Sequence, residues 1–233
     1  MIASRVAAVR ERIARAAARA GRSPDDVTLV AVSKTQPPEV VREGFAAGLC
    51  HFGENKVQEA EGKVAALADL RAEGLRWHLV GHLQSNKARK AVPLFDRIHS
   101  LDSADLGHRL EHIAAEEHRH LEVLVQVDLA GEATKSGLPE RELFPALEIL
   151  RGLKALSVIG LMVLPPFEED PERTRSFFRR LRELRDDAAR RSLLRGEELS
   201  MGMSHDFEVA VEEGATMVRV GTAIFGERPQ RPA

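Results

Sequence analysis

The chain has 233 residues, 43% of them hydrophobic, and its 34 basic and 36 acidic side chains give a formal net charge of −2. The numbers of basic and acidic side chains are nearly equal, which argues against a strongly basic surface. We therefore expect neither nucleic acid nor a membrane as partner. No apolar run approaches the roughly 18 residues of a membrane span. The single cysteine, Cys50, excludes an intrachain disulfide framework and suits a reducing compartment, so we expect a cytoplasmic protein. A free cysteine usually behaves as a small hydrophobic residue, so we expect Cys50 in the core.

The first segment, Ile2 to Ala20, has apolar residues at helical spacing and is followed by Gly21, which suits a C-terminal cap. Its start is rich in arginine and poor in acidic residues, which is also typical of an organellar transit peptide. The apolar stripe favours a folded helix, and it consists of Val6, Val9 and Ile13.

The next segment, Val27 to Val32, is almost wholly apolar and runs directly into Ser33-Lys34-Thr35. A short apolar run of this kind is typical of a strand that is buried on both faces. Pro37 and Pro38 stop the run. We therefore expect Lys34 at the C-terminal end of a buried strand.

Extended and helical patterns alternate through the rest of the chain. We expect further strands at His51–Gly53, Arg76–Val80, Arg97–Leu101, Leu121–Leu129, Ala155–Val163, Glu198–Met201 and Thr216–Val220. We expect helices at about 37–48, 56–71, 85–93, 103–118, 139–150, 171–190 and 205–213. The tail from Glu227 to Ala233 is polar with two prolines, and we expect it to be loose.

Eight strands that alternate with helices predict a parallel sheet with helices outside it, and a count of eight closes a barrel. The competing architecture is an open doubly wound sheet, which normally carries a glycine-rich fingerprint after its first strand. Here that position holds Ser-Lys-Thr-Gln-Pro-Pro. The prediction is therefore an α/β protein with a single (β/α)8 TIM barrel and an additional N-terminal helix, forming one domain over residues 1–233.

Lys34 is the first candidate functional residue. A lysine at the edge of an apolar core has its charged form disfavoured, which frees the amine as a nucleophile of the kind that forms a Schiff base. The chain has far fewer lysines than arginines, so a lysine here is less easily taken as filler. The alternative is a strand-end lysine whose ammonium simply reaches water.

Other polar residues follow the remaining strands, at the face where barrels place their active sites. Asn55 and His82 follow the second and third strands, and Ser204 follows the seventh. After the eighth strand, Gly221-Thr222-Ala223 can begin a short helical turn whose free backbone N–H groups would bind an anion. The loops after strands seven and eight therefore predict a phosphate site opposite Lys34.

Arg219 lies within the eighth predicted strand and has two interpretations. It can be a barrel-interior arginine paired with a carboxylate. It can also be a cation that faces the ring nitrogen of a pyridine cofactor, which would stay unprotonated because a guanidinium does not readily release its proton. The pattern alone leaves both open.

Several long motifs in order along the chain resemble the pyridoxal phosphate homeostasis proteins, whose barrel is similar to the N-terminal barrel of alanine racemase. They are Ala31–Thr35, Phe52–Asn55 with Val57–Glu59, Trp77–His78 with Gly81–Lys87, Lys135–Gly137, Gly160–Met162, Ser200–Ser204 with Asp206, and Met217–Gly226. The resemblance implies pyridoxal 5'-phosphate as cofactor, held on Lys34 as an internal aldimine.

The resemblance also implies roles for the other site residues. Ser204, Gly221 and Thr222 would hold the phosphate, Arg219 would face the pyridine nitrogen, and Asn55 and His82 would lie near the ring. His205 departs from the family pattern, which commonly has an acidic residue there. Lys135 could be a second anion contact, but a solvated surface lysine is the simpler interpretation. His108 and His112 have metal-ligand spacing on a helix, yet no acidic third ligand at a strand end accompanies them, so we expect no metal.

Two functions compete on this basis. The first is a non-enzymatic protein that carries and buffers pyridoxal phosphate, with the apo forms of pyridoxal phosphate enzymes as candidate acceptors. The second is an amino-acid racemase, which needs a second acid or base opposite the lysine; in the alanine racemase family that group is a tyrosine, and this chain has none. An arginine at the ring nitrogen also weakens the cofactor as an electron sink. Both points favour the carrier, which we expect to be a monomer, while a regulatory partner-binding module stays open.

Overall fold

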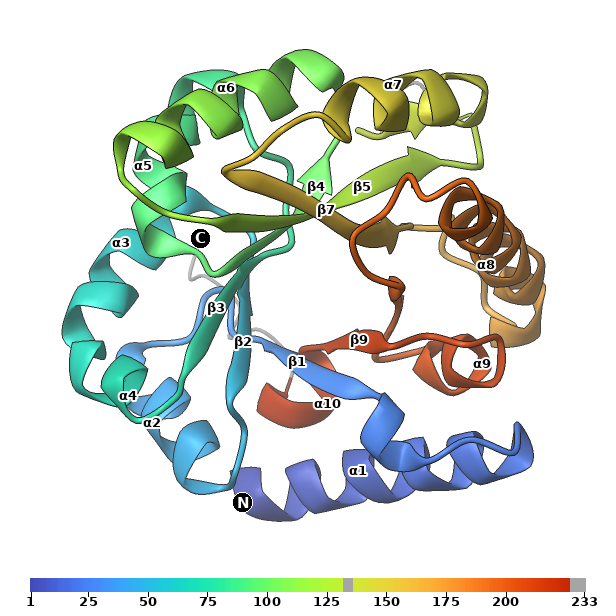
Figure 1. Ribbon diagram of the computed structural model, residues 1–233. Coiled ribbons are helices and arrows are strands. Elements are labelled where there is room, and N and C mark those ends of the chain that lie inside the picture. The colour runs from blue at the N-terminus through green and yellow to red at the C-terminus, as the bar shows by residue number, and fades with distance from the viewer. Residues whose placement is uncertain (132–135, 227–233) are drawn as a thin grey trace, which may run out of the picture.

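Eight parallel strands close into a barrel with helices around it (Figure 1). This computed structural model describes residues 1–131 and 136–226. The barrel strands are β1 (Thr28–Val32), β2 (His51–Glu54), β3 (Arg76–Leu79), β4 (Arg97–Leu101), β5 (Leu121–Asp128), β7 (Leu156–Met162), β8 (Glu198–Met203) and β9 (Met217–Val220). Their order is β4-β3-β2-β1-β9-β8-β7-β5, and pairing of β4 with β5 closes the ring.

Helices surround the barrel, with one before the first strand and a short one at the end of the barrel after β9 (Figure 1). They are α1 (Ile2–Arg19), α2 (Pro38–Ala46), α3 (Val57–Ala66), α4 (Ala68–Ala72), α5 (Ala88–Leu94), α6 (Ala104–Glu116), α7 (Leu143–Leu150), α8 (Arg175–Arg190), α9 (Phe207–Glu212) and α10 (Thr222–Phe225). Short 3-10 turns lie at Pro24–Asp26, Ser85–Lys87, Glu140–Glu142 and Pro171–Thr174. The predicted (β/α)8 barrel with an N-terminal helix is confirmed.

The helix α1 lies beside the junction of the first and last barrel strands, where it packs against α9, α10 and α2 (Figure 1). Its buried residues are Val6, Val9, Ile13, Ala16 and Ala17, which include the whole predicted stripe. Arginines on its outer side fasten it to α9: Arg12 pairs with Glu208 at 2.9 Å, and Arg19 pairs with Glu212 at 2.6 Å. The helix α1 therefore supports the last elements of the barrel, α9 and α10, from outside.

Several local expectations were wrong. Cys50 is exposed, since it lies in the turn before β2 and not in the core. The single helix expected over 56–71 is two helices, because Leu67 leaves helical geometry with φ −122°. Leu138–Pro139 forms a short extra strand, β6, beside β5 before α7 begins. The predicted loose tail lies outside the described residues, so the single domain over 1–233 stays a prediction.

No helix among the described residues is both long enough and apolar enough to cross a membrane.

Candidate functional site

A cavity of about 630 Å³ opens at the C-terminal ends of the barrel strands. Its wall includes residues from the loops after β1, β2, β3, β7, β8 and β9. All seven residues proposed from the sequence line it: Lys34, Asn55, His82, Ser204, Arg219, Gly221 and Thr222. Active sites in (β/α)8 barrels lie at this face because the loops that follow the strands converge there.

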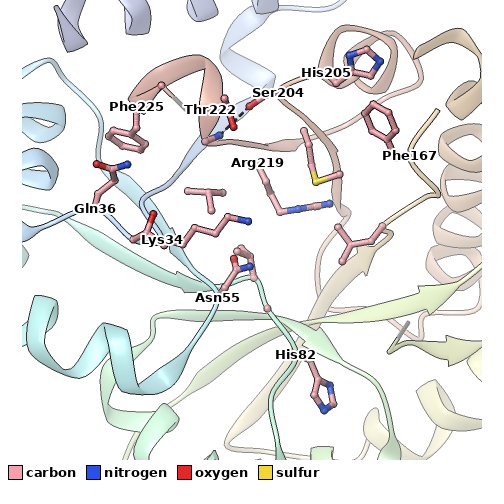
Figure 2. Close-up of a pocket in the computed structure, with 18 of the residues that line it drawn as sticks. Lys34, Gln36, Asn55, His82, Phe167, Ser204, His205, Arg219, Thr222 and Phe225 are labelled. Atoms are coloured by element: carbon pink, nitrogen blue, oxygen red, sulfur yellow. Dashed lines mark hydrogen bonds between the residues drawn. The ribbon is translucent and has the colours of Figure 1, made fainter. Parts of the chain in front are cut away.

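Lys34 stands two residues beyond the end of β1 and reaches into the centre of the cavity (Figure 2). Its side chain is half-buried. The next residue, Thr35, has φ +67°, a left-handed conformation that is costly for a β-branched side chain. Glu59 accepts a hydrogen bond from the backbone N–H of Thr35 and so stabilises this turn. The loop that carries Lys34 is therefore held in one strained shape.

A buried polar cluster supports the same loop from behind. Lys63 donates hydrogen bonds from Nζ to the carbonyl of Ser33 at 2.7 Å, to Glu54 Oε1 at 2.8 Å and to Glu59 Oε1 at 2.8 Å. The Ser33 hydroxyl also donates to Glu54 Oε1 at 2.6 Å. Burial raises the pKa of Glu54 in spite of the nearby Lys63 ammonium. The cluster engages one lysine with carboxylates, while the neighbouring Lys34 faces the cavity.

Arg219 is 3% exposed and lies inside the barrel at the base of the cavity. Its guanidinium donates to Ser200 Oγ at 2.6 Å and to the carbonyl of Val163 at 2.9 Å. Burial lowers the pKa of Arg219 to about 10, which still leaves the group charged at neutral pH, and Asp206 nearby opposes the shift. Figure 2 shows the guanidinium and the Lys34 amine in the same central space.

A group of hydrogen-bond donors lies at the opposite wall. Ser204 Oγ accepts from the backbone N–H groups of Gly221 at 3.2 Å and Ala223 at 3.3 Å, at the start of α10. Thr222 is exposed beside it (Figure 2). A Cβ on residue 221 would lie 3.2 Å from the carbonyl of Val32, so glycine allows this close approach. Hydroxyl and backbone donors together are suited to an anion.

Asn55 and His82 differ in their placement. Asn55 and Lys34 line the same central space in Figure 2, and Gly81 packs so closely on Asn55 that a Cβ at residue 81 would fall 2.3 Å from the Asn55 carbonyl. His82 stands at the margin with its ring turned away from the centre, and its Nδ1 lies 3.1 Å from Asp102 Oδ2. Contact of both residues with a bound ring stays a prediction, and the placement favours Asn55.

His205 restrains the loop that follows β7. Its Nε2 lies 3.0 Å from the carbonyls of both Glu168 and Glu169, and its ring packs on Phe167 with centroids 5.3 Å apart. Phe167 is 77% exposed and forms part of the cavity wall. The histidine that departs from the expected pattern therefore fixes one rim of the cavity.

The cavity combines an amine, a buried cation and a cluster of anion-binding donors on three sides of one space. A phosphorylated pyridine aldehyde has the three matching groups: an aldehyde for the amine, a ring nitrogen for the guanidinium, and a phosphate for the Ser204–Ala223 donors. These residues therefore fit pyridoxal phosphate.

The family model for the N-terminal domain of alanine racemase matches residues 5–229. A pyridoxal phosphate homeostasis protein of Aquifex aeolicus is 46% identical over 224 residues, covering 96% of this chain and 97% of that protein. The chain belongs to the pyridoxal phosphate homeostasis protein family. The protein of that name from Escherichia coli is 40% identical over 232 residues, covering 97% of both chains.

Solved structures agree with this assignment. PipY of Synechococcus elongatus, in a structure with pyridoxal phosphate bound, is 44% identical with a TM-score of 0.86, covering 97% of this chain and all of that one. Alanine racemase of Corynebacterium glutamicum is 22% identical with a TM-score of 0.67, covering 95% of this chain and 61% of that one. The second likeness shows the shared barrel fold alone.

Sequence reasoning missed the polar groups inside the barrel. His78, His99 and Ser200 are fully buried and connect to Arg219, and Lys63 supports the Lys34 loop. Histidines within three successive predicted strands were the available signal. Lys135, considered above as a second anion contact, lies outside the described residues.

Proposed function

We propose that this protein binds pyridoxal 5'-phosphate and carries or buffers it without catalysing a reaction of its own. The observation that supports this most directly is the convergence of Lys34, Arg219 and the Ser204 donors on one cavity of about 630 Å³. Relatives at 40–46% identity bear the name pyridoxal phosphate homeostasis protein, and PipY at 44% identity has a structure with the cofactor bound.

The contacts within the cavity support a role for each residue. When bound, pyridoxal phosphate supplies an aldehyde that condenses with a primary amine and releases water. Lys34 provides that amine, Arg219 donates toward the ring nitrogen and keeps it unprotonated, and Ser204, Gly221 and Thr222 receive the phosphate. Asn55 contacts the ring beside Lys34, and His82 contacts it from the margin once the imidazole has turned toward the centre of the cavity.

We also propose the setting of this function. The protein works as a monomer in the cytoplasm and passes the cofactor to apo forms of pyridoxal phosphate enzymes. Sedimentation of the ligand-loaded protein tests the monomer, and reactivation of an apo-enzyme by the loaded protein tests the transfer.

The first prediction concerns Lys34. The loaded protein is expected to be yellow, and Lys34→Ala should remove the visible absorption band because no other lysine amine lines this cavity in the described part of the chain. Borohydride reduction followed by peptide mapping identifies the modified residue. The matched control is Lys90→Ala, which removes an exposed lysine paired with Glu61 and should leave the band intact. A pyridoxyl adduct on Lys56 or Lys63 would overturn the assignment.

The second prediction separates the carrier from a racemase. Arg219 at the ring nitrogen provides a poor electron sink, and the chain has no tyrosine to return a proton to the opposite face. Incubation with amino acids in heavy water should therefore give slow or absent deuterium exchange at Cα, with no inversion by chiral analysis. Exchange with inversion at roughly 1 to 10³ per second would establish an enzyme. His82→Ala would then test the residue at the cavity margin as the second base.

A further inference from the structure

A continuous row of hydrogen-bonded side chains crosses the interior of the barrel. His51 Nδ1 lies 3.0 Å from His78 Nε2, and His78 Nδ1 lies 2.8 Å from His99 Nε2. His99 Nδ1 lies 2.8 Å from Ser200 Oγ, which also accepts the 2.6 Å hydrogen bond from Arg219. We call His51, His78, His99 and Ser200 the histidine row.

The row connects the two ends of the barrel. Arg219 lines the cavity at the C-terminal ends of the strands. His51 begins β2 and lines a second cavity, of about 600 Å³, between α1 and the N-terminal ends of β1 and β2. His78, His99 and Ser200 between them are fully buried. The side chains come from four strands, β2, β3, β4 and β8, so the row is a feature of the closed barrel.

Such a row is unusual for a barrel interior, which bulky apolar side chains normally fill. Other parts of this interior do follow that rule, with Val30, Val32, Val80 and Met217 on one side and Leu124, Ile159 and Met162 on another. A second polar group, in which Arg97 pairs with Glu122 and Glu198, joins β4 to β5 and β8. Buried polar groups are tolerated only when their partners are satisfied, and removal of one partner leaves the next uncompensated. Packing alone would favour apolar side chains in place of the row. Its hydrogen bond to Arg219 offers another reason for these polar residues.

Arg219 imposes a direction on the whole row. A guanidinium can only donate, so Ser200 Oγ accepts from Arg219. Among the described residues, the other hydrogen-bond partner of this hydroxyl is His99 Nδ1, so the buried Ser200 O–H has an acceptor only if His99 Nδ1 is unprotonated. His99 then carries its proton on Nε2 and donates to His78 Nδ1, and His78 in turn donates from Nε2 to His51 Nδ1. One arrangement of protons satisfies every member, with each histidine neutral and protonated on Nε2.

We propose that the histidine row positions Arg219, holding its guanidinium in one orientation through Ser200 so that its remaining N–H groups face the ring nitrogen of the bound cofactor. The role toward the ring nitrogen rests on the proposed function. The carbonyl of Val163 fixes the other guanidinium nitrogen, at 2.9 Å. Ser200, His99 and His78 thereby become positioning residues that lie outside the cavity wall.

The environment of the rings agrees with this arrangement, which requires neutral histidines. Burial lowers the pKa of both His78 and His99 well below the ordinary value, and the charges of Arg219 and Arg97 lower the pKa of His99 further. Burial also lowers the pKa of His51, where Arg97 and Arg76 act in the same direction and Asp96 opposes them.

The direct test is NMR of the histidine ring nitrogens in the ligand-free wild-type protein. The expected result is that His51, His78 and His99 all carry the proton on Nε2, with Nδ1 unprotonated. A proton on Nδ1 of His99 would overturn the proposal, because His99 would then donate to Ser200, and the proton order that links the row to Arg219 would be lost. This measurement needs neither a variant nor the cofactor, so its failure is distinct from failure to bind pyridoxal phosphate.

A matched pair of serine variants tests the coupling to Arg219. Ser200→Ala should change the ring-nitrogen signals of His99 and His78 and weaken pyridoxal phosphate binding about tenfold. Ser157→Ala also removes a buried serine hydroxyl, which pairs with His120 outside the row, and it should change neither. Ser200→Thr keeps the hydroxyl and should restore both. Unchanged histidine signals and unchanged affinity in a folded Ser200→Ala protein would overturn the proposal.

Discussion

At the scale of single residues, the cavity depends on groups that bind one another before any ligand arrives. Ser204 Oγ lies within hydrogen-bond distance of two backbone N–H groups of the α10 turn. These donors are preorganised, because the hydroxyl, Gly221 and Ala223 already share one local geometry. A phosphate oxygen at this place would meet all of them without rearrangement of the backbone.

The third prediction follows for Ser204→Ala. Loss of one hydrogen bond to a charged group costs about 1.5–3 kcal/mol, so the dissociation constant for pyridoxal phosphate should rise about tenfold or more. Affinity for unphosphorylated pyridoxal should hardly change. Titration of the visible band with both ligands measures this. Equal losses for the two ligands would mean that Ser204 supports the fold and does not bind the phosphate.

The residues of the cavity wall could be predicted from the sequence, but those behind it could not. Lys34, Ser204 and Arg219 stand in or after predicted strands, and the barrel rule places such positions at one face. Contact between His78 and His99 depends on the stagger between neighbouring strands, which the alternation of side chains within one strand does not specify. The Lys63–Glu54 pair likewise joins a helix to a strand end through packing alone.

At the scale of elements, ion pairs join α8 to the end of α9. Glu213, just after α9, has a side chain that is 7% exposed and pairs with Arg175 and Arg179 at 3.1 Å and with Arg182 at 3.2 Å. Burial acts to raise the pKa of Glu213, but hydrogen bonds from Arg179 and Arg175 outweigh it and hold that pKa below the ordinary value. The three arginines lie on α8, so one carboxylate fastens two helices.

The fourth prediction compares two glutamate variants in this region. Glu213→Gln should lower the free energy of unfolding by about 1.5–3 kcal/mol, because three arginines of α8 lose the negative charge of the nearly buried carboxylate that they share. Glu183→Gln is the control, since that side chain is 52% exposed and pairs with Arg180 in solvent, so the change should stay within about 1 kcal/mol. Urea unfolding of both proteins at neutral pH is the measurement. Equal effects would contradict a special role for the buried carboxylate.

The number and type of the main elements could be predicted, whereas their interruptions could not. Helical spacing continues across Leu67, yet the chain leaves helical geometry there to begin α4. The two-residue strand β6 pairs with the end of β5 and has no periodic signal of its own. Such details are decided by tertiary packing, which overrides local propensity.

At the scale of the whole molecule, the buried histidines link stability to pH. Burial lowers the pKa of His51, His78 and His99 in the folded state, so below about pH 6.5 the unfolded chain binds protons that the folded chain does not. The free energy of unfolding therefore falls as the pH falls through this range. Each histidine that remains neutral in the fold contributes about 1.4 kcal/mol per pH unit.

The fifth prediction is a loss of stability on mild acidification, from about pH 7.5 to about pH 5.5, measured by urea unfolding. Glu212 and Glu213 do not cause a loss in this window, because their lowered pKa values mean that those carboxylates lose their contribution only below about pH 4.5. The raised pKa values of the buried carboxyls Glu54 and Asp206 act in the opposite direction and reduce the slope. A flat profile across the window would contradict this prediction, and NMR of the histidine ring nitrogens over the same pH range would show whether the three rings take up protons in the folded protein.

Because the first barrel strand, β1, pairs with the last one, β9, the cavity can form only late in the synthesis of the chain. Lys34 follows the first barrel strand and Arg219 lies in the last, and these strands are hydrogen-bonded neighbours, with Val30 opposite Arg219 (Figure 1). At about 5–20 residues per second, the ribosome releases β9 roughly ten to forty seconds after β1. For that interval a nascent chain carries β1 as an open edge, which is a template for pairing with other chains. Cofactor can be captured only once translation has passed α10, so an occupied site marks a finished barrel.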